Sequence, residues 1–77
     1  MQKTQTLQDR FLIQCRRERM PVTVFMVNGF QMRGAIVDYD SFVILLDAEG
    51  KQEMVYKHAV STIMPIRPIP LSEEQPG

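Results

Sequence analysis

The chain has 77 residues, with nine basic and nine acidic side chains, a single cysteine and a single histidine. One cysteine excludes an internal disulfide, and one cysteine with one histidine provides too few ligands for a structural zinc site. A domain this short buries only about 60 % of its unfolded surface, so we expect copies of the chain to support one another. The lone cysteine and the polar N-terminus predict a cytoplasmic protein without a membrane span.

The first predicted element is a helix over about residues 7–19, preceded by an N-terminal extension of residues 1–5. Thr6 and Asp9 have the spacing of a capping box, with Asp in place of the usual Glu. Pro21 prevents the helix from continuing, because Met20 before it is biased away from helical geometry. An apolar stripe at helical spacing is predicted to face the core, and it consists of Leu7, Phe11, Leu12 and Cys15.

Five short antiparallel strands are predicted between about residues 22 and 65, because β-branched and aromatic runs alternate there with turn signals. The apolar run 42–46 is expected to be buried on both sides, and Gly34 suggests a bend or bulge in the second strand. Five short strands with such a kink favour a strongly bent sheet or small open barrel. The edge strands of an open barrel need a partner, and strands from neighbouring copies would supply one.

Asn28-Gly29 predicts a two-residue hairpin turn that places Val27 opposite Phe30. Phe25 would then lie opposite Met32, and all four apolar side chains would share one face. This face is either part of the core or an exposed platform on which bases stack. The opposite face, with Val24 and Met26, is apolar too, so the periodicity leaves both interpretations open.

Arg16, Arg17 and Arg19 form the one tight basic cluster of an otherwise neutral chain. A short charge run at a helix end is usually a solvated end that complements the helix dipole. The alternative is phosphate binding, which copies repeated around an oligomer would strengthen.

The sequence Tyr56-Lys57-His58 lies at a break between two strands. It combines stacking surface, charge and directional hydrogen bonds, which suits a single-stranded base. An enzyme with His58 as base and Cys15 as nucleophile is a remote alternative, since Cys15 lies on the apolar stripe and no nucleotide or nucleophile motif is present. We therefore predict no catalytic residue, no metal and no cofactor.

Three stretches carry a resemblance to a known family: LQDRFLIQCRRERMPVTVFMVNGF, GAIVDYDSFVILL and MVYKHAVSTIMP. They resemble Hfq, the family of bacterial Sm-like RNA chaperones. The resemblance implies an Sm-like fold over residues 6–66, a short flexible tail over 67–77, and a homohexameric ring closed by strand pairing. It also implies RNA partners, namely small regulatory RNAs and messenger RNAs, whose annealing the ring promotes in post-transcriptional regulation.

The resemblance further implies three RNA-binding surfaces. The proximal face, which takes U-rich RNA, corresponds to Gln8, Ser41, Phe42, Tyr56, Lys57 and His58. The distal face, which takes A-rich RNA, corresponds to Phe25, Gly29, Phe30, Gln31, Met32 and Thr62. The rim corresponds to Arg16, Arg17, Arg19 and Tyr39. Ser41, Tyr39 and Glu53 depart from the residues common in the family at their positions, and Glu53 makes one adenine contact doubtful.

A rival from another class is a structural ring that acts through protein contacts, with little RNA annealing. Binding of A-rich and U-rich oligonucleotides separates the two hypotheses.

Overall fold

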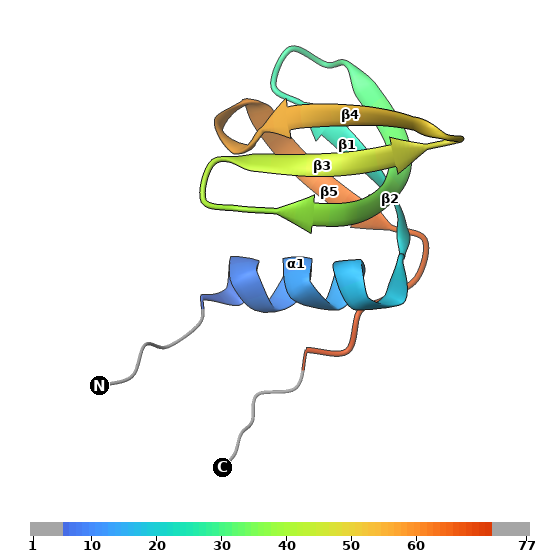
Figure 1. Cartoon of the computed structure of the whole chain (residues 1–77). Coiled ribbons are helices and arrows are strands. Elements are labelled where there is room, and N and C mark those ends of the chain that lie inside the picture. The colour runs from blue at the N-terminus through green and yellow to red at the C-terminus, as the bar shows by residue number, and fades with distance from the viewer. Residues whose placement is uncertain (1–5, 72–77) are drawn as a thin grey trace.

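The computed structural model describes residues 6–71 and consists of one helix and one bent sheet (Figure 1). The elements in chain order are α1 (Leu7–Glu18), β1 (Pro21–Met26), β2 (Gln31–Tyr39), β3 (Val43–Ala48), β4 (Lys51–Tyr56), the 3-10 turn η1 (Lys57–Ala59) and β5 (Val60–Pro65). The five strands form one antiparallel sheet in the order β4-β3-β2-β1-β5. This confirms the predicted helix and five-stranded open sheet, and it leaves β4 and β5 as the two edges.

Helix α1 begins and ends with defined caps. The Thr6 hydroxyl accepts the backbone N–H of Asp9 at 3.0 Å, which is the predicted N-terminal cap. At the other end Arg19 adopts φ +48°, and the Met20 N–H donates to the Cys15 carbonyl at 3.0 Å, as in a Schellman motif. The helix therefore ends at Glu18, and the chain reverses toward β1 directly after the basic cluster.

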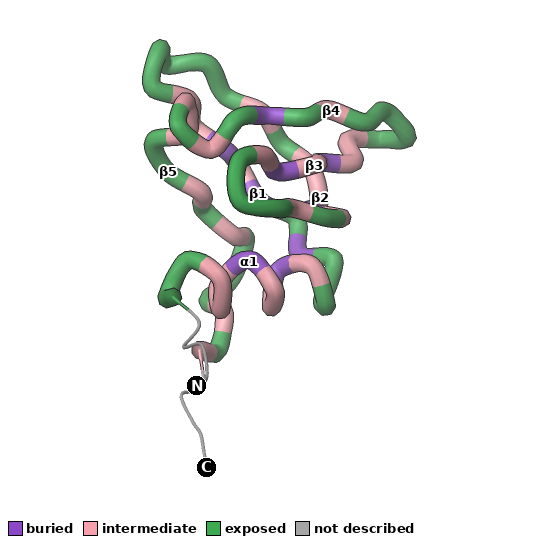
Figure 2. Tube along the Cα trace, turned by 60° about the vertical axis from the view of Figure 1, so that its left-hand side comes forward, coloured by how far each residue is buried: buried purple, intermediate pink, exposed green. Residues whose placement is uncertain are grey.

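The core lies between α1 and the concave side of the sheet (Figure 2). Its fully buried residues are all apolar, and they are Leu12, Cys15, Met20, Val22, Val24, Ile36, Ile44, Leu46 and Val55. The prediction that Leu7 joins them is wrong, because Leu7 lies beyond edge strand β5 and is 59 % exposed. Strand β3 buries Ile44 and Leu46 but leaves Val43 and Leu45 half-buried, so only one of its sides is fully buried.

The β1–β2 hairpin differs from the prediction by one residue. Phe25 pairs with Gln31, the Met26 N–H donates to the Phe30 carbonyl at 2.8 Å, and Val24 pairs with Met32. The loop therefore contains three residues, and Phe25 does not share a face with Phe30 and Met32.

The reason for the shift is the conformation of Asn28. A two-residue turn of the expected type requires positive φ at both central residues, but only Gly29 has it, at +92°. The Gly29 N–H donates to the Met26 carbonyl at 2.9 Å, and the Asn28 side chain accepts the Phe30 N–H at 3.0 Å. This is the pattern of a type I turn followed by a left-handed glycine, in which a side-chain bond of Asn stabilises the turn.

Strand β2 bends sharply and pairs with β1 along its first half and with β3 along its second. A Cβ atom on Gly34 would lie 2.8 Å from the Asp47 carbonyl oxygen, so the backbones of β2 and β3 approach too closely for a side chain. The register shift itself lies further on, between Ile36 and Asp38. Gly34 thus permits a close approach of two strands, and the bulge that the sequence indicated at Gly34 begins two residues later.

Beyond β5 the described chain runs back under α1. Ile69 packs against the core cluster, and Arg67 forms an ion pair with Glu18 at 3.7 Å. The expected extension 1–5 and residues 72–77 of the expected tail lie outside the described residues. Within residues 6–71, no helix has the length and apolarity needed to cross a bilayer.

Candidate nucleic-acid interface

The break between β4 and β5 brings most of the predicted proximal residues together. Tyr56 pairs with Val43 at the end of the β3–β4 ladder, and the Lys57 N–H donates to the Phe42 carbonyl at 2.8 Å. Phe42 is 74 % exposed and Tyr56 is 55 % exposed. Phe42 and Tyr56 are therefore both exposed at adjacent positions of the β3–β4 pairing, and Lys57 and His58 follow Tyr56 directly in the chain.

The turn η1 orders these side chains further. The rings of Tyr56 and His58 stack, with 5.7 Å between their centroids and 29° between their planes. Lys57 and Gln8 line the same small cavity of about 130 Å³, which places a helix residue and a turn residue at one site. Gln8 of α1 therefore lies beside Lys57, whose backbone bonds to Phe42, and exposed Ser41 lies in the adjoining turn.

Asp40 is a residue of this site that the sequence reasoning did not assign to it. Its carboxylate accepts the backbone N–H groups of Phe42 at 2.8 Å and of Val43 at 2.9 Å. These two bonds, with a smaller contribution from the charge of Lys57, hold the pKa of Asp40 below its ordinary value of 3.8. Its position in a predicted turn could have revealed this role, because Asp side chains in turns accept hydrogen bonds from backbone N–H groups two residues further along the chain.

Three of the predicted distal residues form a row across three strands. Phe25 of β1 pairs with Gln31 of β2 on one side and with Thr62 of β5 on the other, so the three side chains share the outer face. Gly29 and Phe30 lie in the adjoining hairpin loop on the side of the sheet away from α1 (Figure 1). Phe30 is 62 % exposed.

Met32 is separate from this row. It pairs with buried Val24 and packs against the core cluster. The hairpin therefore presents Phe25 and Phe30 to solvent from different faces and turns Met32 inward.

The three arginines at the end of α1 differ in their contacts. Arg16 forms an ion pair with Asp38, with 3.1 Å between the guanidinium and the carboxylate oxygen, and its guanidinium also lies 5.3 Å from the centre of the Tyr39 ring. Arg17 and Arg19 are exposed, and within the described chain neither has an acidic group within ion-pair distance. Two of the three predicted rim arginines therefore present unpaired charge.

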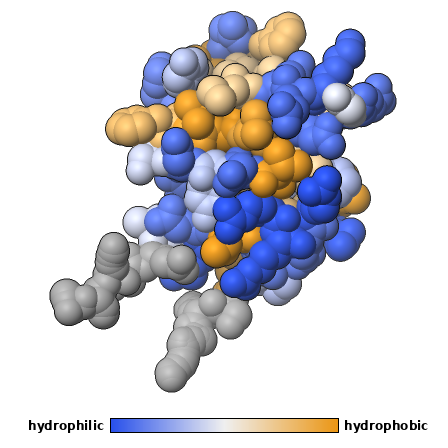
Figure 3. All heavy atoms as spheres, viewed as in Figure 1, coloured by the Kyte–Doolittle hydropathy of each residue, from blue (hydrophilic) through white to orange (hydrophobic). Residues whose placement is uncertain are grey.

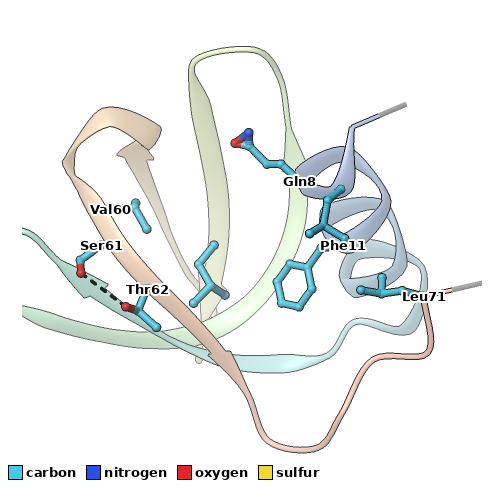
Figure 4. Close-up of a pocket in the computed structure, with 8 residues that line it drawn as sticks. Gln8, Phe11, Val60, Ser61, Thr62 and Leu71 are labelled. Atoms are coloured by element: carbon cyan, nitrogen blue, oxygen red, sulfur yellow. Dashed lines mark hydrogen bonds between the residues drawn. The ribbon is translucent and has the colours of Figure 1, made fainter. Parts of the chain in front are cut away.

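An apolar hollow of about 410 Å³ lies along edge strand β5 (Figure 4). Helix α1 contributes Leu7, Gln8 and Phe11, strand β5 contributes residues 60–63, and Leu71 closes one end. Strand β5 has a neighbour on one side only, so this hollow opens where a further strand would pair. Figure 3 shows apolar atoms at the surface of the strands, above hydrophilic side chains of the helix.

The enzymatic alternative finds no support in the structure. Cys15 is fully buried, and desolvation, with a smaller contribution from Glu18, raises the pKa of its thiol to about 11. A buried thiol with a raised pKa is a poor nucleophile. Among residues 6–71, no three His, Cys, Asp or Glu side chains are grouped as a metal site would need.

Comparison with known proteins identifies one family throughout. The family model "Hfq protein" matches residues 7–70. The "RNA-binding protein Hfq" of Moorella thermoacetica is 56 % identical over 75 residues, covering 96 % of this chain and 89 % of the relative. That of Clostridium perfringens is 52 % identical over 69 residues, covering 90 % and 86 %.

A solved structure agrees with these relatives. The crystal structure of "the pleiotropic translational regulator, Hfq" superposes with a TM-score of 0.74 at 46 % identity, covering 77 % of this chain and 98 % of that one. The sequence resemblance, the bent five-stranded sheet behind one helix and these matches all lead to one conclusion: this chain belongs to the Hfq family.

Proposed function

We propose that this chain is an RNA-binding chaperone that holds U-rich and A-rich single strands on different faces of a ring and promotes their annealing. The observation that carries the proposal is the convergence of Phe42 with Tyr56, Lys57 and His58 at one end of the barrel. Relatives that are 56 % and 52 % identical to this chain carry the name RNA-binding protein Hfq. The family is one of RNA-binding proteins and not of enzymes.

The proximal site supplies the interactions that a uracil in a single strand needs. An exposed ring such as Phe42 stacks on a base, which is worth about 1–3 kcal/mol per base. Lys57 supplies charge for the phosphate, and Gln8 and His58 supply directional hydrogen bonds to base edges or ribose. Their common position at one barrel end allows a single nucleotide to contact several of them.

The distal surface has a different character. The row of Gln31, Phe25 and Thr62 alternates an aromatic ring with two polar side chains on the outer face. Stacking on Phe25 and amide hydrogen bonds from Gln31 suit a purine such as adenine. Exposed Phe30, which does not share a face with Phe25, offers a second stacking surface at the hairpin.

The ring supplies what one copy lacks. Edge strands β4 and β5 each have one free side in the described chain, and the hollow along β5 lies beside Gln8 of the proximal site. A neighbouring β4 paired with β5 would cover this edge and bring a second copy's side chains next to Gln8. We therefore propose a homohexamer in which each proximal site lies at a junction between copies.

Annealing follows from holding two RNAs at once. A small RNA on one face and a messenger on the other have a raised effective concentration for each other. Arg17 and Arg19, repeated around the rim, reduce the phosphate repulsion where the strands meet. These partners are in the cytoplasm, and we propose that the protein acts there.

Two alanine variants test the proposal by their opposite effects. Phe42→Ala should weaken binding of a uridine oligonucleotide by about 5- to 150-fold, the equivalent of one lost stack of 1–3 kcal/mol, and leave adenosine binding unchanged. Phe30→Ala should weaken adenosine binding and leave uridine binding unchanged. Fluorescence anisotropy titrations on the purified assembly measure both, and a variant that weakens both ligands equally would show that the faces are wrongly assigned.

The rival hypothesis, a structural ring acting through protein contacts, makes a different prediction for the same titrations. Neither oligonucleotide would bind to the correctly assembled parent protein.

A further inference from the structure

Tyr39 connects two surfaces that the sequence treats as separate. The Arg16 guanidinium lies 5.3 Å from the centre of its ring, and the Lys57 ammonium lies 5.4 Å from the same centre. Arg16 belongs to the basic cluster of α1, whereas Lys57 belongs to the proximal site. One aromatic ring therefore contacts a cation from each.

The ring is held firmly by its own surroundings. Tyr39 is half-buried, packs against the core cluster and pairs with buried Ile44 at the end of β2. Its backbone N–H donates to Asp38 at 2.9 Å, to the same carboxylate oxygen that binds Arg16. The position of the ring is thus fixed before any ligand arrives.

A fixed ring restricts the cation that lies over it. A free lysine side chain has four rotatable bonds and loses about 2 kcal/mol of rotamer entropy when it is immobilised. A cation over an aromatic face within about 6 Å of the centroid is attracted to it, most strongly when it is partly desolvated. Lys57 is half-buried and lines the cavity that it shares with Gln8, while its ammonium lies over the Tyr39 ring.

We propose that Tyr39 is a positioning residue for proximal RNA binding, which holds the Lys57 ammonium in place for a bound nucleotide and acts through Lys57 without stacking on a base itself. This inference rests on the proposed function. It differs from a direct rim contact, because the ring acts on RNA through the Lys57 ammonium that lies 5.4 Å from its centre. Pre-ordering Lys57 lowers the entropic cost of binding a phosphate or a uracil edge.

The test compares Tyr39→Leu, which removes the ring, with Tyr39→Phe, which keeps it. Tyr39→Leu should weaken binding of a short uridine oligonucleotide by about two- to fivefold, the equivalent of one exposed cation–π contact, and Tyr39→Phe should bind like the parent. Binding of an adenosine oligonucleotide to the same preparations is the control for an intact assembly. If Tyr39→Leu weakens only long RNA and leaves the short uridine ligand unaffected, Tyr39 is a direct rim contact and the inference is wrong.

A double-mutant cycle shows whether Tyr39 acts through Lys57. In a Lys57→Met background, Tyr39→Leu should have no further effect on uridine affinity. An undiminished effect in that background would overturn the inference.

A measurement without RNA separates this inference from the proposed function. In NMR spectra of the free protein, the Lys57 side-chain methylene signals should carry a ring-current shift that Tyr39→Leu removes and Tyr39→Phe retains. Loss of the shift without any uridine binding by the parent would refute the proposed function while leaving the Tyr39–Lys57 contact established. Signals that do not respond to Tyr39→Leu would refute the contact itself.

Discussion

The Asp40 carboxylate organises the turn that presents Phe42. It binds two consecutive N–H groups, those of Phe42 and Val43, and its own N–H donates to the Val43 carbonyl at 3.0 Å. Asp40 thus stabilises the turn with both its side chain and its backbone. These bonds fix the backbone of Phe42, from which the exposed ring extends. The Asp40 carboxylate thereby contributes to the geometry of the predicted proximal site.

Asp40 should make both stability and the turn sensitive to acid. Its pKa in the folded protein lies below 3.8, so the ionised form is stabilised by folding, and this stabilisation is present above the unfolded pKa. It is lost as the pH falls through the lower, folded pKa. We expect the thermal midpoint of the parent to decrease over this acidic range, and that of Asp40→Asn to decrease less.

The control is Glu49→Gln, which removes an exposed carboxylate in the β3–β4 turn. Thermal scans of the three proteins from neutral pH to below pH 3 would measure the effect. The same acid dependence in Asp40→Asn and the parent would show that the two backbone bonds do not stabilise the folded state.

At the scale of single elements, strand β2 determines the shape of the sheet. Its first half pairs with β1 and its second half with β3, with the bulge after Ile36 between them. Because Gly34 has no side chain, the backbone of β2 can approach β3 closely. A Cβ atom added to Gly34 would lie only 2.8 Å from the Asp47 carbonyl oxygen. The bend places the basic end of α1 near Asp38 and Tyr39.

Gly34→Ala should destabilise the fold, because the new methyl group would collide with backbone atoms of Asp47 and Ala48, which cannot move aside as a flexible side chain could. We expect a loss of about 1–3 kcal/mol, the usual cost of overpacking, measured by chemical denaturation. Gly34→Asn should be worse, since it is larger.

Gly29 provides the contrast. No atom lies within 4 Å of a Cβ added there, but its φ is +92°. Asn tolerates positive φ better than Ala does, so Gly29→Asn should be milder than Gly29→Ala. The same order at both glycines would show that backbone conformation, and not the contact with Asp47, is what matters at Gly34.

The end of α1 is the element that we propose meets long RNA. Replacing Arg16, Arg17 and Arg19 by alanine should slow annealing strongly and change short-oligonucleotide binding little. It should also flatten the salt dependence of long-RNA binding, because each lost phosphate contact on a single strand removes about 0.7 from the log–log slope. Arg17→Ala with Arg19→Ala should reproduce most of this effect, since Arg16 is already paired with Asp38.

Annealing rates, salt titrations and thermal midpoints on one preparation check the arginine prediction. If the arginines serve only the helix dipole, worth about 0.3–1 kcal/mol each, the triple variant would lose stability but anneal at the parent rate.

Periodicity and turn signals in the sequence were sufficient to predict α1, the five strands and their order along the chain. The hairpin register was not predictable, because Asn28-Gly29 suits both a two-residue turn and the three-residue turn observed, and only the φ of Asn28 distinguishes them. The Tyr39–Lys57 contact was not predictable either, since it depends on how far β2 bends toward η1. Residues joined by local geometry, such as Tyr56 and His58, were found from the sequence pattern itself, whereas distant pairs such as Gln8 with Lys57 were grouped only through the family resemblance.

At the scale of the whole molecule, the core is small and the sheet is open. Among residues 6–71, nine apolar residues are buried, and β4 and β5 each lack a neighbour on one side. Unpaired strand edges are sites of association unless something covers them. Met54 and Tyr56 on β4 and Met64 on β5 add exposed apolar surface along these edges.

We therefore expect that the chain is not a stable monomer at working concentration. Multi-angle light scattering of the purified protein should give a multiple of the 8.9 kDa chain mass, with folding confirmed by circular dichroism. A folded species near 8.9 kDa would show that the thin core is sufficient without partners.

The two edges of the sheet are unlike, because β4 forms one and β5 the other. A contact between unlike surfaces is heterologous, and it cannot be satisfied by a two-fold dimer. Each added copy leaves one free edge of each kind, so the assembly grows until the rotation from copy to copy completes a full turn, or else it continues as a filament. The number of subunits in a closed ring is then set by the rotation angle between neighbouring copies, and this angle depends on the curvature of the sheet between β4 and β5. A substitution that straightens β2 would change the symmetry of the assembly before it unfolded a single copy.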